Sequence, residues 1–264
     1  MIDIHSHILH GFDDGARSIE DSILIVRQAV EDGTSVLFAT PHLSEPPDFT
    51  NSGRIVEAAK SLETALTEQG ISVRILPGAE VFPSSVVLES LDKGLPITLG
   101  DKRQHILLEM PFSVMPLRLD YLIFELQTRG ITPILAHPER SAAIQAGMER
   151  LEEHLQKGLL IQINATSLLG ANGKEAAAIA FRLLEHNWVH FVASDTHSPR
   201  MRPSRLKEAR DLLADTMEAD AIDQLFVQNG QRIIDGEPIP SNPKPYSPAT
   251  PVGLMARFRS FFSP

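Results

Sequence analysis

Two histidines separated by one residue stand near the start of the chain, in the run Met-Ile-Asp-Ile-His-Ser-His. Ile2 and Ile4 alternate with polar residues, which predicts a short buried strand over this segment. Residues two apart on an extended strand point to the same side, so His5 and His7 are expected to face one region. Imidazole nitrogens are common metal ligands, and the pair is therefore a candidate for the beginning of a metal site.

Further apolar runs predicted as strands also lead into ligand-type residues. A single histidine at a strand end is often only a hydrogen-bonded core residue, and a glutamate there often pairs with a cation. The repetition at successive strand ends favours a shared metal centre instead. The donors are nitrogen and oxygen without sulfur, which suits Mn²⁺, Fe²⁺ or Zn²⁺. The candidate ligands are His5, His7, His42, Glu80, Glu109, His137, Asp195 and His197.

This set of ligands is too large for one catalytic ion that keeps a position open for water. We therefore expect two or three ions, with carboxylates bridging them. Adjacent ions lower the pKa of a bridging water and hold the oxygens of an in-line displacement. Four other histidines, at helical positions and strand starts, are expected to be structural, and His10 is left open; the four are His105, His154, His186 and His190.

The elements that must position these residues alternate along the chain. Apolar runs predict strands at 1–7, 36–39, 73–76, 106–108, 131–136, 159–163 and 190–193, and helical patterns lie near 19–33, 53–69, 117–128, 148–157 and 175–185. Alternating strands and helices imply a parallel sheet. In a closed barrel every strand end meets on one face, whereas an open doubly wound sheet would spread the ends along a line. We predict an α/β fold, a slightly irregular seven-stranded barrel over residues 1–235.

Residues 236–264 differ in composition. Recurrent prolines predict an extended, poorly packed linker. The last residues place Met255, Phe258 and Phe262 at helical spacing, with Arg257 and Arg259 between them. This tail either folds back on the barrel, lacks fixed structure, or forms a short amphipathic segment that touches a membrane surface or a partner.

Composition excludes several classes of protein. The net charge of −10 argues against nucleic acid as the main partner. No secretory signal and no apolar run long enough to span a bilayer is recognised, so we expect a cytoplasmic protein. Cysteine is absent, which excludes disulfides, thiolate-held zinc and a cysteine nucleophile. A hydrolase with this composition must use water, a hydroxyl, a carboxylate or a metal.

The chain resembles the PHP (polymerase and histidinol phosphatase) metallohydrolases in the motifs M-I-D-I-H-S-H, T-P-H, G-A-E, L-L-E, A-H-P-E-R and A-S-D-T-H-S-P-R-M-R. Its H-G-F-D-D-G and A-T-P-H-L motifs are similar to those of bacterial manganese-dependent protein-tyrosine phosphatases of capsule and exopolysaccharide operons. The resemblance covers residues 1 to 235. It implies a distorted (β/α)₇ barrel, a trinuclear metal cluster held by the eight ligands above, and phosphate binding by Arg140 and Arg202.

The same resemblance implies a function. A metal-bridging hydroxide, with Mn²⁺ as the expected metal, would attack the phosphorus of a phosphotyrosine, which agrees with the missing cysteine. The leaving phenolate has a pKa near 10, so strong general-acid help is less necessary. Asp14, in the D-D-G turn, is the candidate for that help. The implied partner is an autophosphorylating tyrosine kinase that controls polysaccharide export, and a homo-oligomer is compatible with the sequence.

Two alternatives remain open from the sequence. One is a small-molecule phosphatase, such as histidinol phosphatase, with the same metals. The other is a non-enzymatic regulatory partner of the kinase, for which open coordination positions and catalytic arginines would be needless. The loop 44–52 is expected to border the mouth of the barrel, where Pro46, Pro47 and Phe49 suit an aromatic ring. Acidic residues at the same mouth, Asp13 and Asp14 among them, could instead attract the amine of histidinol phosphate.

Overall fold

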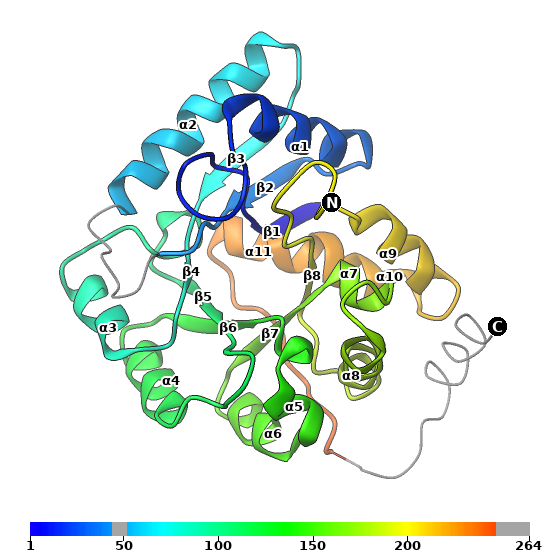
Figure 1. Ribbon diagram of the computed structural model, residues 1–264. Coiled ribbons are helices and arrows are strands. Elements are labelled where there is room, and N and C mark those ends of the chain that lie inside the picture. The colour runs from blue at the N-terminus through cyan, green and yellow to red at the C-terminus, as the bar shows by residue number, and fades with distance from the viewer. Residues whose placement is uncertain (44–51, 247–264) are drawn as a thin grey trace.

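The computed structural model describes residues 1–43 and 52–246. Its parallel strands form two hydrogen-bonded sheets, with strand orders β1–β2–β3 and β4–β5–β6–β7–β8 (Figure 1). The first sheet consists of β1 (Ile2–Ser6), β2 (Val36–Ala39) and β3 (Arg74–Pro77). The second consists of β4 (Glu80–Val81), β5 (His105–Glu109), β6 (Thr132–Ala136), β7 (Leu160–Asn164) and β8 (Phe191–Ala193).

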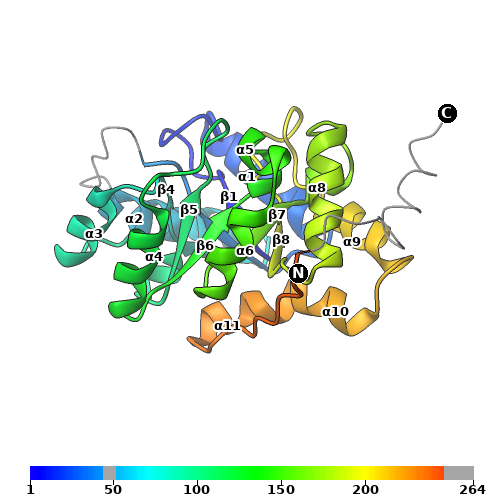
Figure 2. The same ribbon diagram turned by 90° about the horizontal axis from the view of Figure 1, so that it is seen from below.

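Helices surround the strands, and α10 and α11 lie below them in the view of Figure 2. The five predicted helices are confirmed to within about two residues at most of their ends: α1 (Ile19–Glu31), α2 (Ser52–Glu68), α4 (Leu119–Thr128), α6 (Glu149–Gln156) and α8 (Lys174–Glu185). The Ser18 hydroxyl caps α1 by accepting a hydrogen bond from the backbone N–H of Asp21. Unassigned from the sequence were α3 (Ser85–Asp92), α5 (Ala142–Ala146), α7 (Ala165–Leu168), α9 (Leu206–Ala214), α10 (Ala219–Asp223), a π-helix (Gln224–Gln228), α11 (Asn229–Asp235) and the short 3₁₀ helices Leu99–Asp101 and Pro138–Arg140.

The third predicted strand is divided into β3 and β4. The break lies at Gly78, where a Cβ atom would stand 2.9 Å from a methyl group of Leu99 and 3.2 Å from that of Thr40. This close approach turns the chain, so β3 pairs with β2 whereas β4 pairs with β5. The sequence therefore predicted seven strands, whereas the described residues contain eight.

Two isolated parallel bridges lie between the sheets, one pairing Ser6 with Thr196 and the other pairing His42 with Glu80. Next to the first bridge, the N–H of Asp195 donates to the carbonyl of His5 at 2.9 Å. The predicted α/β fold with parallel strands is confirmed. Both bridges fall at strand ends that carry candidate ligands, so the backbone itself brings those ends together.

The hydrophobic core has two parts. The larger part packs between the strands and the surrounding helices. The smaller part consists of side chains from β1, β2 and β5–β8 together with Ile233 and Ile234 of α11. At Gly230 a Cβ atom would stand 2.7 Å from Ile2, so α11 packs closely against the beginning of β1. The apolar end of the strands is thus covered by α11, and the opposite end is left for polar residues.

Residues 237–246 have no helix or strand, as the proline content predicts, and most of them are exposed, but the segment is held to the rest of the chain by several hydrogen bonds. The indole N–H of Trp188 donates to the carbonyl of Lys244 at 2.8 Å, and Arg182 donates to the hydroxyl of Tyr246 at 2.9 Å. The predicted amphipathic tail, with Met255 and Phe258, lies outside the described residues. Within the described ranges, no helix has the length and apolar character needed to cross a membrane.

These contacts predict a difference between two shortened chains. A chain ending at Pro243 should be about 2 to 4 kcal/mol less stable than one ending at Tyr246, because it loses the Tyr246 ring and leaves the buried Trp188 N–H without its acceptor. Urea unfolding of the two purified chains measures the difference. Equal midpoints with equal slopes would show that this segment contributes nothing to folding.

Candidate metal centre

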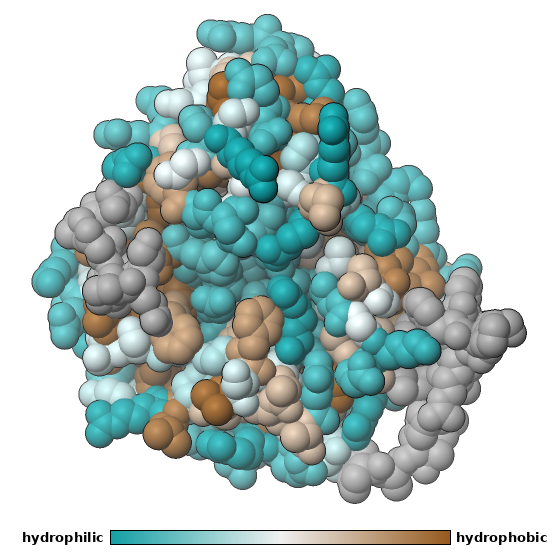
Figure 3. Space-filling model, viewed as in Figure 1, coloured by the Kyte–Doolittle hydropathy of each residue, from teal (hydrophilic) through white to brown (hydrophobic). Residues whose placement is uncertain are grey.

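The eight candidate ligands all lie at one end of the strands. They come from β1, β4 and β5 and from the residues directly after β1, β2, β6 and β8. Most of these side chains are almost fully buried, whereas His42 and Glu109 are about one-third exposed. In Figure 3 this face shows a hydrophilic centre. The structure therefore brings together every ligand that the sequence predicted.

Glu80 is the carboxylate around which the imidazoles gather. Its Oε2 atom lies 3.1 Å from Nδ1 of His42, 3.2 Å from Nε2 of His5 and 3.4 Å from Nε2 of His7. Its Oε1 atom lies 2.9 Å from Nε2 of His137. The Nε2 atoms of His5 and His7 are only 3.0 Å apart. At this distance, at most one of the two nitrogens can carry a proton that points toward the other. Glu80 and these histidines converge on a shared point.

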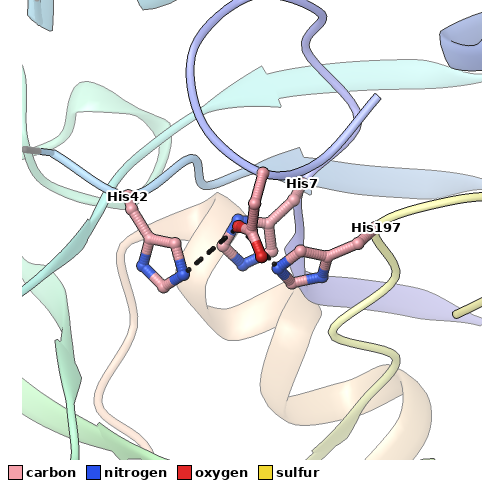
Figure 4. A group of neighbouring side chains, drawn as sticks. His7, His42 and His197 are labelled. Carbon is pink, nitrogen blue, oxygen red and sulfur yellow. Dashed lines mark ion pairs between the residues drawn. The ribbon is translucent and has the colours of Figure 1, made fainter. Parts of the chain in front are cut away.

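A second group of donors lies toward solvent. Figure 4 shows the rings of His7, His42 and His197 close together, with dashed lines that mark the ion pairs within this group. Oδ1 of Asp14 is 3.3 Å from Nε2 of His197 and 3.9 Å from Nε2 of His42. His7 and His197 stack with ring centroids 3.8 Å apart. Asp14, predicted as a general acid, therefore lies where it could also be a metal ligand.

Asp195 joins the donor cluster to the two predicted phosphate-binding arginines. Its Oδ1 atom is 3.4 Å from Nε2 of His7 and 3.6 Å from Nε2 of His5. Its Oδ2 atom accepts hydrogen bonds from Arg140 at 2.9 Å and from Arg202 at 3.1 Å. Both guanidinium groups therefore stand at the edge of the donor cluster.

Several polar residues that were not predicted as part of the metal centre orient the candidate ligands. The Nδ1 atom of His7 is 2.6 Å from Asp13, which also accepts from the backbone N–H of His42 at 2.8 Å. The Nδ1 atom of His5 is 2.9 Å from the side-chain oxygen of Gln162. Such partners fix ring orientation in metal sites. Asn164 likewise donates to Asp195, at 2.7 Å.

Two candidate ligands stand on a backbone that L-residues rarely adopt. Five non-glycine residues in the described ranges have positive φ, and among them are His137 (φ 37°) and Asp195 (φ 51°). This left-handed conformation costs free energy for residues with a Cβ atom. His137 directly follows the buried strand β6, and one residue separates Asp195 from the end of the buried strand β8. The conformation persists because these strands hold both residues in place. Strain of this kind is concentrated at functional sites.

Asp195 is held in its negatively charged form by the imidazoles around it. Burial raises the pKa of Asp195, but the imidazoles of His5, His137 and His7 outweigh burial and hold it well below its usual range. Burial also lowers the pKa of His7, yet its hydrogen bonds with Asp13 and Glu80 raise it to about 10. The site thus favours positive charge at its centre, and divalent cations would supply that charge.

The donors fit metal ions by position as well as by chemistry. Nδ1 of His137 is buried without a hydrogen-bond partner among the described residues, and Nδ1 of His42 and Nε2 of His197 lie close to carboxylate oxygens without the geometry of a hydrogen bond. Three overlapping groups have ligand atoms within 4.8 Å of one another: His7, Asp14, His42 and His197; His5, His7 and Glu80; and His42, Glu80 and Glu109. His7, His42 and Glu80 are each shared by two groups. This overlap is the arrangement that bridged ions need.

The remaining histidines lie elsewhere. His190 accepts from the N–H of Ile161 and bonds to Ser241, and burial lowers its pKa to about 4. Burial likewise lowers the pKa of His105 to about 4. His154 and His186 are on the helical side of the molecule, at the ends of α6 and α8. None of these four belongs to the donor cluster, and His10 is exposed.

The fold and this cluster together define a class: an α/β protein with parallel strands whose nitrogen and oxygen donors, gathered at one end of the sheets, can hold metal ions. More particularly, the chain belongs to the family described as capsular polysaccharide synthesis, CpsB/CapC, whose model matches residues 1–235.

Named relatives of the chain are tyrosine phosphatases. The tyrosine-protein phosphatase YwqE of Bacillus subtilis (strain 168) is 35% identical over 239 residues, which are 90% of this chain and 93% of YwqE. CpsB of Streptococcus pneumoniae, also a tyrosine-protein phosphatase, is 31% identical over 89% of this chain and 98% of its own length. A crystal structure from work on YwqE and CpsB as metal-dependent tyrosine phosphatases superimposes with a TM-score of 0.88, at 35% identity, over 94% of this chain and 100% of that one.

Proposed function

We propose that the chain is a metal-dependent protein-tyrosine phosphatase that removes phosphate from a tyrosine kinase of polysaccharide synthesis or export. The observation that carries the proposal is the position of Arg140 and Arg202, whose guanidinium groups meet on one oxygen of Asp195 beside the donor cluster. Two planar guanidinium groups at that edge can each bind phosphate oxygens by paired hydrogen bonds. Relatives that span almost the whole chain carry the activity in their names.

The roles of the chain's residues follow from this placement. Bound at the eight donors, Mn²⁺ ions, three in number, would supply Lewis acidity for an attacking water and for the phosphate oxygens. Arg140 and Arg202 bind the equatorial oxygens and oppose the negative charge that redistributes during transfer. Asp14, two-thirds exposed and 3.6 Å from Arg202, would be the group that gives a proton to the leaving oxygen. We infer that the strands make a distorted (β/α)₇ barrel, with the two isolated bridges supporting its closure.

An aromatic side chain beside Arg140 favours an aryl phosphate. The guanidinium carbon of Arg140 lies 4.9 Å from the ring centroid of Phe112, and that ring is nearly parallel to the imidazole of His137. The carbonyl of Phe112 accepts from the N–H of Ala142 at 2.7 Å, so the backbone of this loop is fixed. Phe112 is about half exposed. A substrate ring leaving the phosphate site on this side can stack on it.

The surface next to Phe112 suits a protein substrate. Phe112, Val114, Leu117, Tyr121 and Phe124 are five of the nine large hydrophobic residues that are exposed in the described ranges. Figure 3 shows brown side chains over α4 and the segment before it, next to the hydrophilic centre. Exposed apolar patches of this kind mark interaction sites. A small molecule such as histidinol phosphate would leave this patch unused.

Turnover of three substrates tests the proposal. With added Mn²⁺, kcat/KM for a phosphotyrosine peptide should exceed that for a matched phosphoserine peptide and for histidinol phosphate by at least about tenfold. The comparison with phosphoserine reports the leaving group, because a phenolate departs more readily than an alkoxide. The comparison with histidinol phosphate reports the substrate class. A preference for histidinol phosphate would refute the tyrosine-phosphatase proposal and favour the small-molecule phosphatase.

A further inference from the structure

Four arginines line one cavity beside the candidate metal centre. The cavity measures about 570 Å³, and its lining includes Arg140, Arg200, Arg202 and Arg205. Asp195 is the one carboxylate among the described residues that line it. This concentration of positive charge contrasts with the net charge of −10 of the whole chain. A cleft lined by one sign of charge concentrates its field and attracts ligands of the opposite sign.

The arginines differ in how far their charge is already neutralised. Arg140 and Arg202 both bind Asp195. Arg205 is paired with Glu208 through two hydrogen bonds. Arg200, by contrast, forms no ion pair with any residue of the described ranges, and it is exposed at the rim of the cavity. The proposed hydrolysis therefore does not use the positive charge of Arg200.

The backbone around Arg200 is held in a closed turn. The Ser198 hydroxyl oxygen accepts from the N–H groups of Met201 and Arg202, at 3.1 and 3.0 Å. The carbonyl of Arg202 accepts in turn from the N–H of His197 at 3.0 Å. Arg200 thus stands at a fixed backbone position between two residues of the site. A pre-ordered position reduces the entropy lost when an anion binds.

The cavity lining also supplies a neutral donor. The Thr166 hydroxyl oxygen accepts a hydrogen bond from the side-chain amide of Asn172 at 2.9 Å. The hydroxyl hydrogen of Thr166 has no acceptor among the described residues and can be donated to an anion. Thr166 and Arg200 therefore both line the cavity and both offer hydrogen-bond donors.

We propose that this cavity binds a second anionic group of the substrate protein, an acidic side chain or a second phosphate that lies close to the phosphotyrosine in the sequence. Arg200 and Thr166 contact this group, while Arg140 and Arg202 hold the phosphate that is hydrolysed. This inference rests on the proposed phosphatase function, and it names a feature that the substrate must have. It also gives the enzyme a means of distinguishing among phosphotyrosine proteins.

The test uses three phosphotyrosine peptides that differ at one flanking position, which is glutamine, glutamate or a non-hydrolysable phosphonate analogue of phosphotyrosine. The two anionic peptides should have kcat/KM about three- to tenfold above that of the glutamine peptide, as expected for an ion pair near the surface. Added salt should reduce the advantage. Which of the two gains more shows whether a carboxylate or a phosphate is the better ligand.

Variants assign the preference to its residue. Arg200→Ala should bring the three peptides to equal kcat/KM, and Arg200→Glu should make the anionic peptides poorer than the glutamine peptide. Arg150→Ala, at an exposed position of α6 away from the cavity, is the matched control and should retain the preference. Hydrolysis of the glutamine peptide by each variant verifies that it is folded and active.

Two results would overturn the inference: equal kcat/KM for the three peptides in the unaltered protein, or an unchanged preference in Arg200→Glu. Failure of the phosphatase proposal looks different, because then the glutamine peptide itself is not hydrolysed. Calorimetric binding of the same peptides, with phosphonate in place of the phosphotyrosine, gives the comparison without turnover. Equal dissociation constants there would refute the anionic subsite whatever the activity.

Discussion

Replacement of Glu80 by glutamine is expected to lower kcat/KM for a phosphotyrosine peptide by at least about a thousandfold and to reduce the amount of bound metal. Glutamine has nearly the same shape, so the change removes a negative charge and replaces one oxygen by an amide nitrogen. The two oxygens of Glu80 lie within 3.4 Å of nitrogens of His5, His7, His42 and His137. Because Glu80 belongs to two of the overlapping donor groups, more than one ion loses a ligand.

Elemental analysis of the purified variant, together with initial rates in added Mn²⁺, measures both effects. Glu153→Gln is the matched control, since Glu153 is exposed on α6 and far from any candidate ligand in the sequence. The control should retain full metal content and activity. If Glu80→Gln also kept both, the assignment of Glu80 as a shared ligand would be wrong.

Most of the strand and helix order could be predicted, because apolar runs and helical spacing repeat along the chain. The short elements could not. Helix α7 has four residues and therefore no periodic stripe, and a π-helix has no sequence signature of its own. Helix α9 does have one: Leu206, Ala209 and Leu213 are buried at helical spacing. This spacing is a helix signal that the sequence itself carries.

The division between β3 and β4 depends on a contact distant in sequence. Gly78 turns the chain where the Leu99 side chain and Thr40 leave no room for a Cβ atom. No local pattern states which residues will lie against that glycine. The packing of Tyr246 is similar: proline spacing indicates an extended backbone, but only the folded chain shows that Trp188 and Arg182 hold it.

The candidate ligands could be predicted because one rule covers them all: parallel strands bring their ends to one side. The residues that orient them lack such a rule. Gln162 and Asn164 had a readable signal, since two polar residues alternate with isoleucines on a buried strand. Asp13 differs from its neighbour Asp14 only by the shape of the turn, which places Asp13 on His7 and Asp14 on His197. No sequence pattern identifies Phe112 as part of the site, because its position depends on the conformation of a loop.

Alanine at Arg140 or at Arg202 is expected to leave the metal content unchanged and to lower kcat/KM by about two to four orders of magnitude. Each arginine donates to Oδ2 of Asp195, but so does Asn164, at 2.7 Å. Losing one guanidinium therefore leaves two donors to hold this carboxylate. The variant loses a guanidinium group that would bind the phosphate oxygens by paired hydrogen bonds.

Lysine at either position tests the contribution of the positive charge separately from that of the guanidinium shape. Arg140→Lys and Arg202→Lys should recover part of the rate, because lysine restores the charge without the paired hydrogen bonds. Inhibition by inorganic phosphate should weaken in the alanine variants, whereas metal content by elemental analysis should not change. Asn164→Ala is the contrasting variant: it contacts Asp195 without reaching the phosphate, so it should affect metal content first and phosphate inhibition less. If the arginine variants lost metal together with activity, Arg140 and Arg202 would act by holding Asp195, and phosphate binding would have to be assigned elsewhere.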